Sequence, residues 1–334
     1  MNRRTILKLG AVAVAAAAIG GGAYARRSRL RSETITGEWP EAGQGVFWLL
    51  PGLTDARMVV PDRPHTPDEA RDAAARARIG RVRTFFVNTS DKRLRGADFA
   101  EKPAVTRLLA IGDSVTFGWG VADDESWPAK LAAELARRGR QVEVLNAGVP
   151  AQRIEAMVSF LGKIAPRWSP HGVIFTRRPY PQTPDPVQHY AEAIGQAQRA
   201  LPQARIMVVM PPVSRFDPRG CRGYRAESEG VRARLGGTPV VELTDVFRAA
   251  QGQRGASLVE EGGRVRVVRL ETGEALVDAA ADGRGLPREV YDLFERDASV
   301  REALFFDDGH PDADGMDVFA RAVADAVEER RWLG

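Results

Sequence analysis

From residue 106 onward, short apolar runs alternate with amphipathic stretches, and this alternation restricts the fold more than any other feature. The apolar runs, typical of strands, cover residues 106–111, 142–146, 172–176, 205–210 and 239–243. The amphipathic stretches, typical of helices, cover residues 127–138, 154–164, 189–201, 225–235 and 316–330. Strands separated by helices pair in parallel through right-handed crossovers. The chain is therefore predicted to be an α/β protein, a three-layer α/β/α sandwich with a parallel, flavodoxin-like sheet.

Ligands of such sheets bind beyond the carboxyl ends of the strands, where the strand order reverses. Ser114 follows the first predicted strand, Gly148 ends or follows the second, and Arg177 and Arg178 follow the third. These three motifs are expected on one rim of the sheet. The rim is thus the predicted location of a site.

A second motif lies just before the last predicted helix, where Asp307 and His310 are three positions apart. Serine becomes a good nucleophile when a base takes its proton, and an imidazole is the best base when a carboxylate fixes its tautomer. Ser114, His310 and Asp307 together predict a serine hydrolase. Asp308 is a rival for the carboxylate.

Each residue also has a purely structural interpretation. Ser114 is of a type that commonly caps a helix or turn after a strand. His310 alone would be read as a surface histidine, and Gly148 as a turn glycine. Asp312 and Asp314 are expected to cap the last helix. The combination of motifs favours the catalytic interpretation of Ser114, Asp307 and His310.

Gly-Asp-Ser after a strand and D-x-x-H-P near the C-terminus resemble the SGNH/GDSL hydrolase family, whose members cleave or transfer acyl groups of esters. The resemblance covers roughly residues 104–334 and is more specific than Gly-Asp-Ser alone. It implies that Ser114 is the nucleophile, that His310 and Asp307 complete a triad, and that the N–H groups of Ser114 and Gly148 hold the oxyanion. It implies no metal and no cofactor.

The chain departs from the family at one position. The family has an oxyanion asparagine after the third strand, where this chain reads Thr-Arg-Arg-Pro. Losing one oxyanion donor typically lowers the rate by about 10²–10³. Arg178, or its neighbour Arg177, is the expected substitute. The alternative is an impaired site in a protein that binds a glycan or a partner of the cell envelope.

Three segments lie outside this core. Residues 1–25 resemble a twin-arginine export signal, with Arg3 and Arg4 before a mild apolar run and a small-residue cleavage site. A membrane association through residues 1–31 is the alternative. Residues 26–103 lack the strand–helix alternation and are expected to form a small appendage. Residues 257–277 are expected to insert a β-hairpin, either a lid or a surface decoration.

Composition excludes several classes of function. The net charge is +4, and residues 1–25 hold three basic and no acidic residues, so the remainder is near neutral. The sequence therefore gives no argument for a nucleic-acid partner. The single cysteine excludes an internal disulfide, and the four histidines show no zinc-binding spacing. The expected partner is an acyl-ester small molecule or an acylated glycan, met in the periplasm or outside the cell.

Overall fold

A computed structural model describes residues 32–62, 82–179, 183–281, 286–300, 302–307 and 309–333. The segment expected to be an export signal or anchor, residues 1–25 or 1–31, lies outside the described residues, as does the rival carboxylate Asp308. Within the described part of the chain, no helix has the length and apolar character needed to cross a bilayer.

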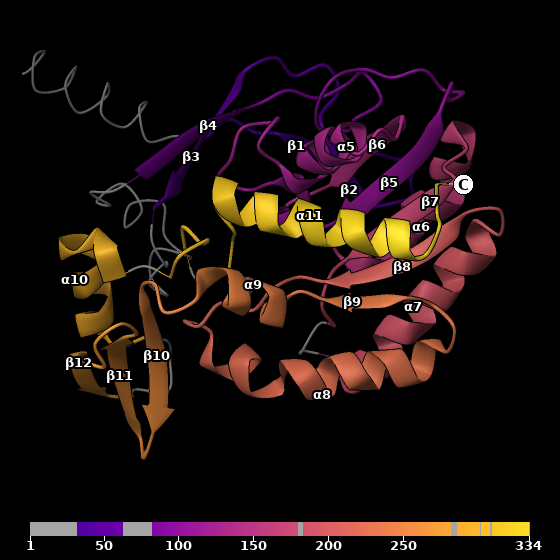
Figure 1. Ribbon diagram of the computed structural model, residues 1–334. Helices are drawn as coiled ribbons and strands as arrows, with labels where there is room; N and C mark the ends of the chain where they lie inside the picture. The colour runs from indigo at the N-terminus through magenta and orange to yellow at the C-terminus, as the bar shows by residue number, and fades with distance from the viewer. Residues whose placement is uncertain are drawn as a thin grey trace, which may run out of the picture.

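A parallel sheet of five strands forms the centre of the molecule (Figure 1). Its strands are β5 (Thr106–Gly112), β6 (Val142–Gly148), β7 (Gly172–Thr176), β8 (Arg205–Met210) and β9 (Val240–Glu242). Their spatial order is β6-β5-β7-β8-β9, and every neighbouring pair is parallel. This order reverses direction at β5, which confirms the predicted flavodoxin-like sheet and puts the end of β5 at the switch point.

Helices cover both faces of the sheet, which confirms the three-layer architecture (Figure 1). The helices are α4 (Ser114–Phe117), α5 (Trp127–Arg137), α6 (Ile154–Lys163), α7 (Pro186–Ala200), α8 (Pro218–Leu235), α9 (Thr244–Gln251) and α11 (Ala313–Glu329). Side chains of a strand alternate between faces. Leu109 and Ile111 of β5 accordingly pack with α6 and α7, whereas Leu108 and Ala110 pack with α5, α9 and α11.

The described residues before β5 form two short antiparallel ribbons rather than βαβ units. One pairs β1 (Thr36–Glu38) with β2 (Phe47–Leu49), and the other pairs β3 (Ala56–Pro61) with β4 (Val82–Val87). Their buried apolar side chains belong to the same hydrophobic cluster as one face of the main sheet. Trp48 of β2 stacks on Phe160 of α6 with ring centroids 4.3 Å apart. This segment is therefore packed into the main core.

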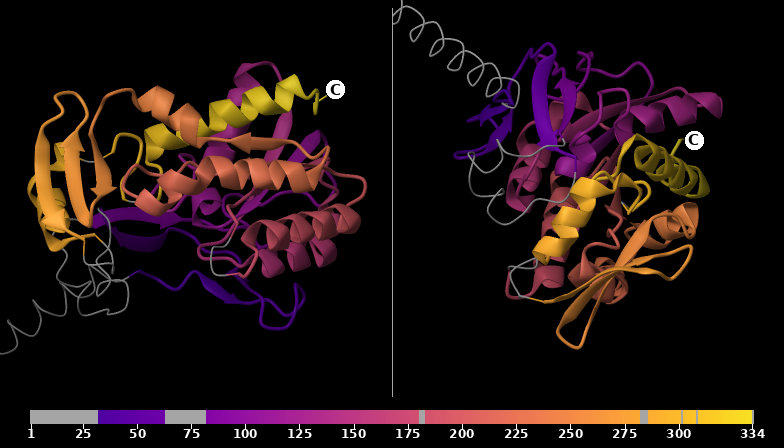
Figure 2. Two further views of the ribbon diagram at one scale, coloured as in Figure 1. Left: turned by 90° about the horizontal axis from the view of Figure 1, so that it is seen from below. Right: turned by 90° about the vertical axis from the view of Figure 1, so that its left-hand side faces the viewer.

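The insertion after α9 is larger than the hairpin that the sequence suggested. It contains three antiparallel strands, β10 (Ala256–Glu261), β11 (Arg264–Arg269) and β12 (Ala275–Ala280), followed by α10 (Arg288–Arg296). These elements bury a separate small cluster that includes Leu258, Val267 and Phe294. Figure 2 shows the insertion beside the sandwich, at one end of the molecule.

Candidate active site

The turn after β5 presents Ser114. Asp113 caps α4, because its carboxylate accepts a hydrogen bond from the Val115 N–H, and Ser114 is the first residue of that helix. A side chain at Gly112 would overlap the Thr116 hydroxyl and the Thr176 carbonyl. The Gly-Asp-Ser sequence is thus explained residue by residue: glycine for space, aspartate for the cap, and serine at the half-buried start of α4.

Asp307 and His310 lie in a tight loop just before α11. A bridge between Phe305 and Pro311 closes this loop. Asp307 is buried, and its Oδ1 accepts hydrogen bonds from the backbone N–H groups of Gly309 and His310 at 2.9 and 2.7 Å. Its Oδ2 lies 2.8 Å from His310 Nδ1. The three-residue spacing therefore lets one carboxylate order both the loop and the imidazole.

The pKa of Asp307 reflects two opposing effects. Burial alone would raise it, but the neighbouring His310 and the two backbone N–H donors stabilise the ionised form. The net direction is a lowered pKa for the Asp307 carboxyl. These contacts favour the ionised form of the Asp307 carboxyl beside the imidazole.

The fold brings the serine and the histidine together across 196 residues of sequence, with His310 Nε2 2.8 Å from Ser114 Oγ. With Nδ1 protonated and donating to Asp307, Nε2 is the acceptor for the Ser114 hydroxyl proton. The three groups thus form a continuous chain from carboxylate to imidazole to hydroxyl. Asp312, by contrast, caps α11 by accepting from the Gly315 N–H, as its position in the sequence suggested.

Gly148 lies beside this turn, but its N–H is directed elsewhere. It donates to the Asn146 side-chain oxygen at 3.0 Å. A side chain at Gly148 would overlap the backbone of Thr116 and Phe117 in α4. The arrangement therefore does not match the expected oxyanion donor, and the structural reason for the glycine is close packing against the helix that carries Ser114.

Arg178 likewise does not match the expected oxyanion substitute. Its guanidinium donates to the Pro211 carbonyl at 2.8 Å and pairs with two carboxylates, Glu227 at 2.8 Å and Glu242 at 2.6 Å. A further hydrogen bond reaches the Thr244 hydroxyl. Pro211 directly follows β8, and the other partners belong to α8, β9 and α9, so the arginine ties the far side of the sheet together.

Arg177 is the arginine on the serine side. Its guanidinium lies 3.5 Å from the Asp113 carboxylate and donates to the carbonyl of Gln152. It therefore fastens the loop after β6 to the turn that carries Ser114. Neither arginine is a solvated loop residue, because only 11% of the Arg177 side chain and 19% of the Arg178 side chain are exposed.

Two residues near the site, Ala151 and Arg95, belong to no motif recognised in the sequence. Ala151, in the loop held by Arg177, has a positive φ of 57°, which is unusual for a residue with a side chain. Arg95, from the segment before β5, is buried beside the end of α4. An isolated loop alanine or arginine has no recognisable pattern, so only the folded structure identifies them.

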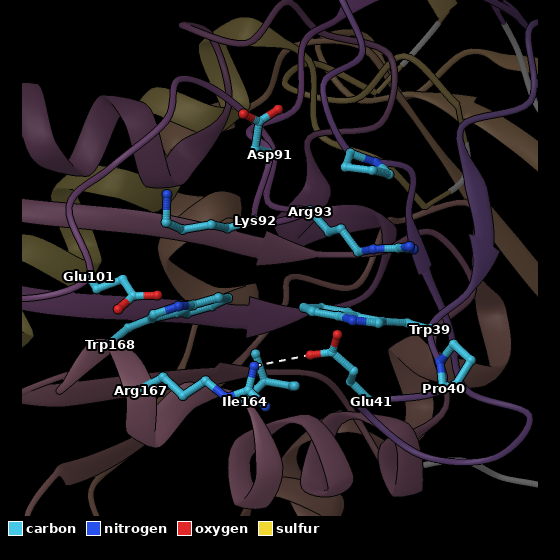
Figure 3. Close-up of a pocket in the computed structure, with 11 residues that line it drawn as sticks. Trp39, Pro40, Glu41, Asp91, Lys92, Arg93, Glu101, Ile164, Arg167 and Trp168 are labelled. Carbon is cyan, nitrogen blue, oxygen red and sulfur yellow. Dashed lines mark hydrogen bonds and ion pairs between the residues drawn. The ribbon is translucent and has the colours of Figure 1, made fainter.

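A cavity of about 550 Å³ lies away from this chemistry (Figure 3). It is lined by Trp39, Trp168 and charged side chains, and the Arg167–Glu41 ion pair spans its lower rim in that view. Ser114, His310 and Asp307 do not line it. Among the described residues, no group of three or more His, Cys, Asp or Glu side chains is placed to hold a metal ion.

No curated protein matches the chain. Many solved structures are similar to it, and three of them serve as examples, all at low identity. A lipase/acylhydrolase from Enterococcus faecalis is 15% identical, with 68% of this chain and 97% of that one covered and a TM-score of 0.45. The acetyl xylan esterase AlAXEase is 13% identical, with 66% and 99% covered and a TM-score of 0.43. A carbohydrate esterase family 2 enzyme from Corynascus thermopiles (Myceliophthora fergusii) is 14% identical, with 70% and 68% covered and a TM-score of 0.41.

The model of the family described as GDSL-like Lipase/Acylhydrolase matches residues 110–318, more than half of the chain. This match includes the serine turn and the D-x-x-H loop. It confirms the resemblance seen in the sequence. The chain belongs to the GDSL-like lipase/acylhydrolase family.

Proposed function

We propose that this protein is a serine-dependent acyl-ester hydrolase, with Ser114 as nucleophile, His310 as general base and acid, and Asp307 as the carboxylate that orients the imidazole. Membership of the GDSL-like lipase/acylhydrolase family supports ester hydrolysis in general. The observation that carries the specific assignment is the chain of two 2.8 Å contacts, Asp307 to His310 and His310 to Ser114.

The reaction follows from these contacts. Ser114 Oγ attacks the ester carbonyl while His310 Nε2 takes the hydroxyl proton, and the carbonyl π electrons move onto oxygen. The tetrahedral intermediate collapses, His310 returns the proton to the leaving alcohol, and an acyl-serine remains. Water repeats the sequence and releases the acid. Asp307 stabilises the imidazolium in both halves, and its lowered pKa keeps it ionised throughout.

For the oxyanion we propose the backbone N–H groups of Ser114 and Ala151 in place of Gly148 and Arg178. Among the described residues, neither N–H has an acceptor. Ala151 adopts its positive φ in the loop that Arg177 fastens to Asp113, beside the serine turn. Backbone donors held by a rigid loop need no reorganisation during the reaction.

The proposed substrates are O-acylated glycans or lipids of the cell envelope. The support is the twin-arginine-like start of the sequence, because signals of this type direct proteins out of the cytoplasm. Replacing Arg3 and Arg4 by Lys is expected to retain the folded protein in the cytoplasm, measured by cell fractionation. Export that continues without the pair would contradict this route. A sugar hydroxyl could take the acyl group in place of water, since both reactions share the acyl-serine.

The direct test of the triad is turnover of p-nitrophenyl acetate. Ser114→Ala and His310→Ala are each expected to lower kcat by about 10⁴–10⁶, because triad members act as a unit. Asp307→Asn is expected to cost less. Asp308→Asn is the matched control for the carboxylate and should leave turnover nearly unchanged. Full activity in folded Ser114→Ala would refute Ser114 as the nucleophile, whereas a folded wild type without turnover would favour the glycan- or partner-binding alternative.

A further inference from the structure

Arg95 is a buried cation outside the region that matches the family. It comes from the segment between β4 and β5, and its side chain is 1% exposed. Buried arginines are rare unless their donors are satisfied. Here the donors are satisfied, and among the described residues the hydrogen-bond partners of the guanidinium all lie within residues 117–123. The contacts are 2.5 Å to the Phe117 carbonyl, 2.7 Å to those of Gly118 and Val121, and 2.6 Å to the Asp123 carboxylate.

This position matters because α4 is a single turn. Its first residue is Ser114 and its last is Phe117. One turn of helix is unstable by itself, since nucleation costs more than its few hydrogen bonds return. Asp113 caps the amino end, and Arg95 binds the carbonyls at the carboxyl end, where a cation also complements the helix dipole. The helix that carries the nucleophile is thus fixed at both ends by side chains.

The same loop supports the histidine. The Trp119 ring lies 6.4 Å from the His310 ring. Gly120 is packed so closely on Phe306 that a side chain there would overlap the ring. Phe306 in turn is stacked on His310, with centroids 5.8 Å apart and planes 19° apart. The loop of residues 117–123, to which Arg95 is bound, therefore contacts the imidazole through two aromatic rings.

Arg95 also reaches the next strand. Its backbone N–H donates to the Asn146 carbonyl at 3.1 Å, and the Asn146 side chain donates to the Phe117 carbonyl at 3.3 Å. The ring of Phe117 lies 4.5 Å from the guanidinium carbon. The end of β6, the end of α4 and the following loop thus meet at one cation.

We propose that Arg95 is a positioning residue that holds Ser114 and His310 at reacting distance. This rests on the proposed function, because it requires Ser114 to be the nucleophile. A displacement of about 1 Å between reacting groups can cost about 10²-fold in rate. Loss of Arg95 should therefore lower the rate of the chemical step more than it weakens substrate binding.

The test compares Arg95 with Arg107, a second buried arginine at the opposite end of β5. Arg95→Met should lower kcat, per folded molecule, by about 10–100-fold with KM changed less than about threefold. Arg95→Lys should recover part of the loss, because it restores a cation to the carbonyls. Arg107→Met should keep the kcat of the wild type. The rate at which a fluorophosphonate modifies Ser114 should be lowest in Arg95→Met, higher in Arg95→Lys, and equal to that of the wild type in Arg107→Met.

If the arginine variants do not fold, substitutions of their acidic partners provide a milder test. Asp123→Asn weakens the ion pair to Arg95, and Glu143→Gln is its match at Arg107. Asp123→Asn should slow labelling by about 3–10-fold and Glu143→Gln should not. If Arg95→Met matched Arg107→Met, and Asp123→Asn matched Glu143→Gln, in kcat and in labelling rate, Arg95 would have a structural role only. That result would overturn this inference and leave the proposed function intact. A folded wild type that is not labelled would overturn the proposed function with it.

Discussion

The two ends of β5 are built in the same way but differ in what surrounds them. At the carboxyl end, Arg95 binds three carbonyls and one carboxylate. At the amino end, Arg107 also binds three carbonyls, those of Ala100, Glu101 and Trp168, and pairs with Glu143. Each guanidinium also lies over a phenylalanine ring. Among the described residues, a chain of contacts from carboxylate to histidine to serine lies at the carboxyl end alone.

In both places a buried arginine joins loops by binding several of their carbonyls. Whether the arginine affects the reaction depends on which residues those loops carry. Cavity size is a poor guide to the same question. The cavity of about 550 Å³ lies among Trp39, Trp168 and their charged neighbours (Figure 3). Ser114, His310 and Asp307 do not line it.

The largest effect is expected from substituting two glycines, one at each end of the parallel strands. Gly148→Ala, at the carboxyl end, pushes a methyl group into the backbone of α4. Gly172→Ala, at the amino end, meets only side chains, Trp332 at 2.8 Å and Leu108 at 2.9 Å. Side chains can move aside more easily than backbone. We expect about a 100-fold loss of kcat/KM for Gly148→Ala.

Gly172→Ala is the control and should cost stability alone, measured as a lower Tm with turnover per folded molecule unchanged. Equal activity in the two variants would show that the packing of α4 against β6 does not control the position of Ser114. It would also weaken the distinction between the two ends.

A smaller effect is expected at Arg178, which lies at the carboxyl edge but faces away from the serine. Arg178→Met leaves Glu242 and Glu227 without their cation and should lower the free energy of unfolding by about 2–4 kcal/mol at pH 7. The acidic limb of the pH–rate profile should stay where it is in the wild type. A shift of that limb would place the arginine near His310 and contradict the contacts described above.

The loss of stability in Arg178→Met should become smaller as the pH is lowered. Burial, partly offset by Arg178, already raises the pKa of Glu227. Without Arg178 it should rise further. A carboxyl whose folded-state pKa exceeds its unfolded value destabilises the fold when ionised, and this cost disappears as the pH falls through the folded pKa toward the unfolded value of about 4.3. The gap between variant and wild type in chemical denaturation should therefore narrow as the pH is lowered below 7.

Much of the fold could be predicted because it depends on local patterns. The alternation of apolar runs and amphipathic stretches identified all five strands of the sheet and predicted that they pair in parallel. Gly-Asp-Ser and D-x-x-H were recognisable because each is a short motif at a strand end or before a helix. Their meeting across the sheet follows from the parallel topology.

The remaining features depend on contacts between distant residues. Neighbouring residues at a strand end point in opposite directions, so the sequence could not decide between Arg177 and Arg178. The role of Gly148 depends on the backbone of a helix that is about 30 positions away. The segment before β5 has no periodic pattern, yet it supplies Trp48 to the core and Arg95 to the serine helix.

Labelling with a fluorophosphonate, followed by peptide mapping in a mass spectrometer, tests the central claim most directly. The account predicts one adduct on Ser114, none in Ser114→Ala, and strongly slowed labelling in His310→Ala, because the reagent reports an activated serine. Folded protein that stays unmodified, or that carries its adduct on another serine, would contradict it.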